Sequence, residues 1–288
     1  MSGSLLLLFV FLSAFLAPPL SRLLRMPVPV GELVIGLLLG HFLAQGVALP
    51  EILGFLADFG FLLLMFLAGL EVDFNLLRQL ERRHFVFYAL YVVGMFLGAG
   101  LLAGLLGVGL AQALILALVS IGLMVATLRD MGILGRAFAK RVLILGVLGE
   151  VASLFGLTAM EKAAHYQGLL SLLKEVGIIA LFFLLLFLAF RLAGLFLWWY
   201  PEVGRRLVYE EDPSAMGIRL SLALMFAAAV MSGLVGLESV LGAFLAGMIL
   251  SYFLQKKHDL EAKLSAMGYG FLIPIFFIRT GMGIDLSG

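Results

Sequence analysis

The sequence predicts an all-α polytopic membrane protein with about ten transmembrane helices. Of the 288 residues, 63% are hydrophobic and only 13% are charged, whereas soluble domains average about 45–50% apolar and about 25% charged residues. A soluble globule of this composition would expose far more apolar surface than water tolerates, so a soluble enzyme is excluded. The apolar residues form continuous runs, without the alternation that is typical of a membrane β-barrel.

Ten apolar runs predict the membrane-spanning helices. The first run has its flanking positive charges, Arg22 and Arg25, after the apolar stretch. A secretory signal peptide carries its positive charges before the apolar core, so we expect a retained first helix. The predicted spans are 4–20, 29–45, 52–70, 85–106, 110–128, 141–160, 174–199, 216–235, 238–254 and 266–286.

Lysine and arginine residues favour one orientation of these spans. Fifteen of the 19 lie in the loops after spans 1, 3, 5, 7 and 9, and loops rich in these residues stay in the cytoplasm. We therefore expect the N-terminus outside, the basic loops in the cytoplasm, and a prokaryotic inner membrane around the chain. A net charge of +1 without a basic tail gives no indication of a nucleic-acid partner.

An internal repeat joins the second and third spans to the ninth and tenth. The two copies lie seven spans apart, an odd number, so their orientations in the membrane are opposite. Inverted repeats are typical of secondary transporters, whose substrate sites form at mid-membrane between the copies. The matching segments are 31–43 with 242–254, 60–66 with 270–276 and, after a two-residue slip, 69–73 with 281–285.

The repeat predicts one transmembrane domain over residues 1–288. Its first copy covers about 29–165, and a partial second copy covers about 238–288. After Asp73 the first copy continues through three more spans, whereas the sequence ends three residues after Asp285. We therefore expect an incomplete second repeat that lacks about three helices, and no soluble regulatory domain.

Glu150 lies near the middle of the sixth span, about nine residues or roughly 14 Å of helix from Arg141. A charge at the centre of a span costs about 2.5–3.5 kcal/mol or more and by default indicates a functional site. Its neighbours Gly146, Gly149 and Ser153 are small enough for close helix approach or a local cavity. One carboxylate that holds either a proton or a cation couples the two fluxes by competition. The alternative is a structural carboxylate, paired with Arg or bonded to Ser.

Arg279 lies inside the tenth span, and two interpretations of it remain open. It pairs with an acid such as Glu150, or its side chain reaches outward to the membrane interface. Glu32, Glu71 and Asp73 lie near span ends, where interface charges, helix caps and polar packing groups are common. The functional alternative is that these three line an intracellular funnel.

Ser120 and Thr127 are hydroxyl residues of the fifth span. We expect their side chains to bond to the preceding turn of a continuous helix. The alternative is a broken helix whose backbone carbonyls coordinate an ion, which Gly122 permits without requiring. Arg129 and Asp130 follow and are interpreted as loop charges.

Glycine pairs four residues apart predict close helix packing. Without a side chain at either position, two helix backbones approach each other closely. The pairs are Gly36 with Gly40, Gly94 with Gly98, and Gly100 with Gly104.

Four blocks of sequence carry a family resemblance. They are RMP at 25–27 leading to GELVIGLLLG at 31–40, FLAGLEVD at 66–73, LGAFLAG at 241–247, and PIFF at 274–277 leading to GM at 281–282. Together they resemble motifs of the monovalent cation:proton antiporter-2 family, which holds the Kef-type and Na+/H+ exchangers. The resemblance covers the whole chain, and it implies exchange of a monovalent cation for protons by a homodimer in the lipid bilayer.

The resemblance also implies where the ion binds. In the family an Asp of the sixth helix, often in an Asp-Asp, Asn-Asp or Gln-Asp pair, carries the ion, and here the carboxylate belongs to a Glu. That pair aligns with Gly149-Glu150, so the carboxylate is kept and the polar partner is lost. The Ser-Thr of the family's broken fifth helix aligns with Ser120-Ile121. We predict Glu150, Ser120 and Ser153 as the ion- and proton-binding residues, and Arg279 as a possible charge partner away from the family's basic position.

Three functions remain open on the sequence. The first is a cation:proton antiporter that uses Glu150 in an alternating-access cycle. The second is a transport-inactive relative that acts as a membrane sensor or assembly subunit, which the lost polar residues favour. The third is an intramembrane enzyme, for which the sequence offers no catalytic pair. No cofactor or metal centre is expected, because cysteine is absent and no two histidines have metal-ligand spacing.

Overall fold

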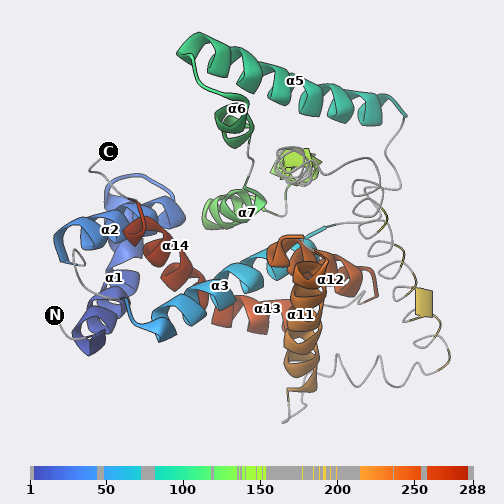
Figure 1. The fold of residues 1–288 in the computed structure, drawn as a ribbon. Coiled ribbons are helices and arrows are strands. Elements are labelled where there is room, and N and C mark those ends of the chain that lie inside the picture. Colours follow the sequence, from blue (N-terminus) through green and yellow to red (C-terminus); the bar gives the residue numbers. More distant parts are fainter. Residues whose placement is uncertain are drawn as a thin grey trace.

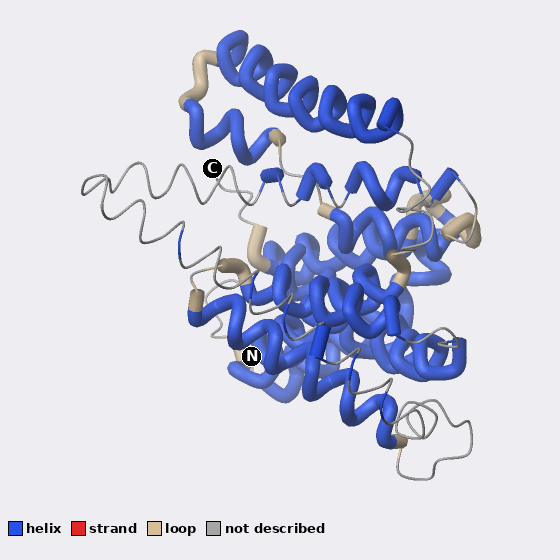
Figure 2. Tube along the Cα trace, turned by 90° about the vertical axis from the view of Figure 1, so that its right-hand side faces the viewer, coloured by secondary structure: helices blue, strands red, loops and turns tan. Residues whose placement is uncertain are grey.

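The described part of the chain is helical throughout, with no strand among its residues (Figures 1 and 2). The structure is a computed structural model. It describes residues 3–43, 49–72, 82–117, 120–134, 136, 138–139, 141–146, 148–150, 152–153, 215–235, 237–253 and 258–284, and a few single positions between 177 and 199.

Ten α-helices and one π-helical turn have defined bounds in these ranges. The α-helices are α1 (Gly3–Leu23), α2 (Val28–Leu43), α3 (Glu51–Leu70), α5 (Arg82–Leu106), α6 (Leu110–Leu116), α7 (Ile121–Asp130), α11 (Met216–Leu234), α12 (Ser239–Phe253), α13 (His258–Met267) and α14 (Ile273–Met282). The π-helical turn is η1 (Gly268–Leu272), between α13 and α14.

The helices agree with the prediction of a polytopic membrane protein. Five described helical stretches are long and apolar enough to cross a membrane, and α2 and α12 are shorter apolar helices. The tenth span begins earlier than predicted, because α13, η1 and α14 form one apolar stretch over Leu260–Met282. The predicted span 174–199 and the second half of 141–160 lie largely outside the described residues.

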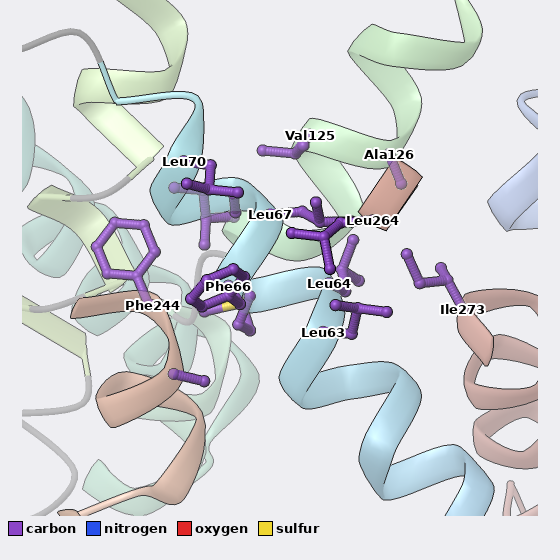
Figure 3. Close-up of a cluster of buried hydrophobic side chains, with 14 of the residues drawn as sticks. Leu63, Leu64, Phe66, Leu67, Leu70, Val125, Ala126, Phe244, Leu264 and Ile273 are labelled. Atoms are coloured by element: carbon purple, nitrogen blue, oxygen red, sulfur yellow. The ribbon is translucent and has the colours of Figure 1, made fainter. Parts of the chain in front are cut away.

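The third helix, α3, lies at the centre of the packing (Figure 1). It contacts α7, α11, α12, α13, α14 and η1. Its C-terminal half, Leu63–Leu70, is buried at every position, which is the reason for its continuous apolar sequence. Figure 3 shows Phe66 of α3 beside Phe244 of α12, and Leu63 and Leu64 facing Leu264 of α13.

Two pairs of helices cross with glycine at the contact. A Cβ placed on Gly36 of α2 would collide with the backbone carbonyl oxygen of Ile278 in α14, and one on Gly281 of α14 would collide with that of Leu33 in α2. The two backbones therefore touch without side chains between them.

The crossing of α3 and α12 has the same form. A Cβ on Gly247 of α12 would collide with the carbonyl oxygen of Phe66 in α3, and one on Gly69 of α3 would collide with that of Phe244 in α12. Phe244 lies 211 residues after Leu33, and Gly247 lies 211 residues after Gly36, which is the offset of the predicted repeat. The inverted repeat stays a prediction, and these matching contacts support it.

The glycine pairs of α5 have no packing partner among the described residues, so close packing there stays a prediction. No described atom comes within 4 Å of a Cβ placed on Gly94, Gly98, Gly100 or Gly104. In Figure 1 α5 lies at the edge of the molecule, next to α6. Small residues permit close packing but do not supply a partner, so the motif alone could not identify the packed face.

The prediction of a continuous fifth span over 110–128 was wrong. The span contains two helices, because α6 ends at Leu116 and α7 begins at Ile121. Ser120 has an extended backbone, with φ of −101° and ψ of 104°, and therefore lies outside both helices. Its hydroxyl does not bond to the preceding turn; it caps the second helix instead.

Candidate functional site

The candidate site is the interruption between α6 and α7, and its first component is Ser120. The first N–H groups of a helix have no partner within the helix, and a serine at the position before the helix satisfies one of them. Ser120 Oγ accepts a hydrogen bond from the backbone N–H of Leu123 at 3.3 Å. The serine thus fixes where the second half of the span begins.

Glu150 supplies the second component, from the following span. Its Oε2 accepts a hydrogen bond from the backbone N–H of Ile121, the first residue of α7, at 2.8 Å. The N-terminus of a helix carries a partial positive charge, so a carboxylate there is stabilised by about 0.3–1 kcal/mol, and by up to about 2 kcal/mol when partly buried. This accounts for an ionisable side chain deep within an apolar span, because the helix end offsets its charge.

Ser153 contacts the chain on the α6 side of the interruption. Its Oγ lies 2.8 Å from the carbonyl oxygen of Ala117, just after α6, and 2.7 Å from that of Gly149. Ser153 is 1% exposed. It lies three residues after Glu150 on a segment whose described residues are helical. One turn of this segment therefore contacts both ends of the broken span.

Together these groups bring a carboxylate, two hydroxyls and the backbone ends of two half-helices to one place. Hard cations prefer oxygen ligands, and interrupted helices supply such oxygens within a membrane protein. A carboxylate in this position also accepts a proton. The arrangement therefore has the chemistry to hold one cation or one proton.

The structure does not bring Arg279 to Glu150. Within the described ranges no hydrogen bond or ion pair joins the two side chains. The buried Nε of Arg279 has no hydrogen-bond partner there, and Nη1 lies beside Gly283 at the end of α14. The pairing of Arg279 with Glu150 therefore stays a prediction without a contact to support it.

Two of the predicted funnel residues, Glu32 and Glu71, lie at helix ends that the predicted topology places in the cytoplasm. Glu32 is 4% exposed, one turn into α2, and the Asp130 carboxylate is close enough to act on it electrostatically. Glu71 follows the last residue of α3 and acts in the same way on Tyr269 of η1. Asp73 lies outside the described residues.

Asp130 and Arg129 were misread as loop charges. They are the last two residues of α7, and both bind to other helices. Asp130 Oδ2 accepts a hydrogen bond from the backbone N–H of Val28, at the start of α2, at 3.0 Å. The Arg129 guanidinium carbon lies 4.5 Å from the centre of the Tyr269 ring. A carboxylate near the start of a helix is a common cap. Asp130 lies 102 residues after Val28, and a cap from so distant a residue is not predictable from the sequence.

An interrupted membrane helix is typical of a secondary transporter. The family of transmembrane sodium/hydrogen exchangers matches residues 11–288. The chain belongs to this family, on its monovalent cation:proton antiporter-2 branch, which confirms the predicted resemblance and indicates a transporter rather than a catalytic enzyme.

Relatives in the same family are named as sodium or potassium transporters. A putative Na+/H+ antiporter of Bacillus subtilis, YjbQ, is 28% identical over 97% of this chain and 47% of its own length. A probable Na+/H+ antiporter of Bacillus cereus, GerT, is 29% identical over 98% of the chain and 74% of its own length. The Escherichia coli glutathione-regulated potassium-efflux protein KefC is 28% identical over 96% of the chain and 44% of its own length. The chain thus spans about half the length of two of these relatives.

The cap formed by Ser120 predicts a measurable loss of stability. Ser120→Ala removes the oxygen that accepts from Leu123, and loss of such a cap costs about 0.5–2 kcal/mol. We expect a lower Tm for the purified protein in thermal unfolding. Ser13→Ala, in α1, removes a hydroxyl with no described hydrogen bond and should leave the Tm unchanged. Equal Tm values for the two variants would exclude the cap.

Proposed function

We propose that the protein exchanges a monovalent cation for protons across the membrane by alternating access, with Glu150 as the shared site. The observation that carries the proposal is the hydrogen bond between Glu150 Oε2 and the Ile121 N–H at the start of α7. It places an ionisable oxygen at the interruption of a spanning helix, where an ion can reach backbone and side-chain oxygens together.

Competition at one carboxylate is sufficient to couple the two fluxes. A cation bound there displaces the proton, and a proton bound there removes the charge that attracts the cation. Ser120 and Ser153 complete the proposed oxygen ligands, and Glu32, Glu71 and Asp73 are proposed as the cytoplasmic route to them. We assign the cation only to the class of Na+ and K+, because the relatives include proteins named for each. A homodimer, with the N-terminus outside, is part of the same proposal.

A transport-inactive relative is the second candidate, and one feature of the site favours it. The Ser153 hydroxyl already serves two backbone carbonyls, and Glu150 already serves Ile121. The Ser153 hydroxyl and the Glu150 carboxylate could therefore serve only as structural caps of the two half-helices. Such a protein would keep its fold, bind no cation at the interruption and act as a sensor or an assembly subunit.

Proton movement in everted vesicles separates the two candidates. Vesicles that contain the chain are acidified by respiration, and the internal pH is followed with a fluorescent dye. An antiporter releases the internal protons when Na+ or K+ is added outside, and an equal concentration of choline has no effect. The cation that works at the lower concentration is the preferred substrate. Absence of any release, from protein that is folded in the membrane, would exclude exchange by this chain.

A further inference from the structure

The short helix α7 is held by a carboxylate at each end. At its N-terminus the Glu150 carboxylate binds the Ile121 N–H at 2.8 Å. At its C-terminus the helix's own Asp130 binds the Val28 N–H of α2 at 3.0 Å. The helix is ten residues long, or about 15 Å, so the two hydrogen bonds lie at opposite ends of one rigid rod.

A second contact fixes the C-terminal end of α7 from another side. Arg129 lies over the ring of Tyr269 in η1, 4.5 Å from the ring centre. A guanidinium over an aromatic face is worth about 0.5–1 kcal/mol when exposed and about 2 kcal/mol when desolvated. The last turn of α7 is therefore fixed between α2 and η1.

Between its ends, α7 makes no further hydrogen bond to another helix within the described part of the chain. Its buried residues Val125 and Ala126 pack against the apolar core around α3, and apolar contacts are not directional. A hydrogen bond to a charged group is directional and stronger. The position of α7 along its own axis thus depends mainly on its two end contacts.

We propose that Asp130 is a positioning residue for the Glu150 site. By holding the last turn of α7 on α2, Asp130 sets the distance between the Ile121 N–H and the Glu150 carboxylate, and so sets the affinity of the site for the cation. The effect on cation affinity rests on the proposed exchange activity. The mechanical link between the two ends of α7 does not depend on it.

Two substitutions separate the hydrogen bond from the charge. Asp130→Asn keeps a side-chain oxygen that accepts from Val28, whereas Asp130→Ala removes it. Asp58→Ala is the matched control, because Asp58 is an exposed carboxylate of α3 with no described hydrogen bond. Arg129→Ala removes the second contact and gives an independent test if Asp130→Ala fails to fold.

Hydrogen–deuterium exchange of the purified protein tests the mechanical link. We expect Asp130→Ala to speed exchange at residues 121–124, at the far end of α7, by about tenfold, which corresponds to the loss of one hydrogen bond to a charged group. Asp130→Asn and Asp58→Ala should exchange there as the unmodified protein does, and Arg129→Ala should show a smaller increase. Unchanged exchange in both Asp130→Ala and Arg129→Ala would overturn the proposal.

The transport assay tests the effect on the cation. We expect Asp130→Ala to raise KM for the cation about fivefold to tenfold with a much smaller change in Vmax, and Asp130→Asn to restore the original KM. A purely structural role would lower Vmax with the amount of folded protein and leave KM unchanged, which would overturn the assignment. If the unmodified chain shows no exchange, the proposed function fails, and the deuterium result still decides whether Asp130 positions α7.

Discussion

Replacing Glu150 by glutamine is expected to abolish cation-evoked proton release while the protein stays folded. The glutamine side chain keeps an oxygen that accepts from the Ile121 N–H, so the contact at 2.8 Å survives the change. The amide carries no charge and neither gains nor loses a proton near neutral pH, so it lacks the negative charge that attracts a cation and cannot deliver a proton. Release in everted vesicles should fall to the level of vesicles without the protein.

Two further variants identify the cause of that loss. Glu150→Ala removes the cap as well as the charge, so we expect the same loss of release together with a lower Tm. Glu51→Gln removes an exposed carboxylate at the start of α3 and should leave release and Tm unchanged. Cation-dependent release that persists in folded Glu150→Gln would show that the carboxylate is a structural cap and that the site lies elsewhere.

Replacing Gly247 by alanine is expected to cause a large loss of stability. The added Cβ would collide with the carbonyl oxygen of Phe66, which belongs to a helix backbone and cannot rotate away. Overpacking a core costs about 1–3 kcal/mol, and occasionally more, and here α12 must separate from the centre of α3. We expect a strong fall in Tm and in the fraction of protein that elutes as a single species in size-exclusion chromatography.

Two further glycine variants provide the comparison, one at the crossing of α2 and α14 and one in α5. Gly36→Ala places its Cβ on the carbonyl oxygen of Ile278 and should cost about as much. Gly98→Ala lies in α5 with no described atom within 4 Å, and alanine is the better helix former by about 0.8–1 kcal/mol. That variant should therefore be as stable as the unmodified protein or slightly more so. Equal Tm values in all three would contradict the packing described here.

The fold class was predictable because burial in a bilayer leaves a strong signal in composition. Continuous apolar runs such as the one in α3 indicate membrane spans. Four glycines that match in the predicted repeat, Gly36, Gly69, Gly247 and Gly281, lie at helix crossings. The glycines of α5 show the limit of this reasoning. Their spacing equals that of Gly36 and Gly40, but contact also depends on which helix lies opposite, and tertiary structure decides that.

The candidate site was predictable in its residues and not in its geometry. Glu150 was recognised from the cost of a charge within a span, and Ser120 and Ser153 lie with it at the interruption. The interruption was the alternative interpretation of the fifth span and not the favoured one, because local propensity allows that span to continue as a helix. Glu150, 29 residues away, stabilises the new helix start by bonding to its first N–H. Asp130 was taken for a loop charge for the same reason, because its hydrogen-bond partner Val28 is distant in the sequence.

The Ser153 hydroxyl has one hydrogen and two carbonyl oxygens at nearly equal distances, 2.8 Å to Ala117 and 2.7 Å to Gly149. It can donate fully to only one of them at a time. Rotation about a single bond therefore transfers the hydrogen from one oxygen to the other, without moving the backbone. Each time it turns to Gly149, the Ala117 oxygen loses this hydrogen bond at the end of the first half-helix. The protein thus has, at the end of the first half-helix, a carbonyl oxygen whose hydrogen bond to Ser153 can be made or broken by rotation of one hydroxyl alone.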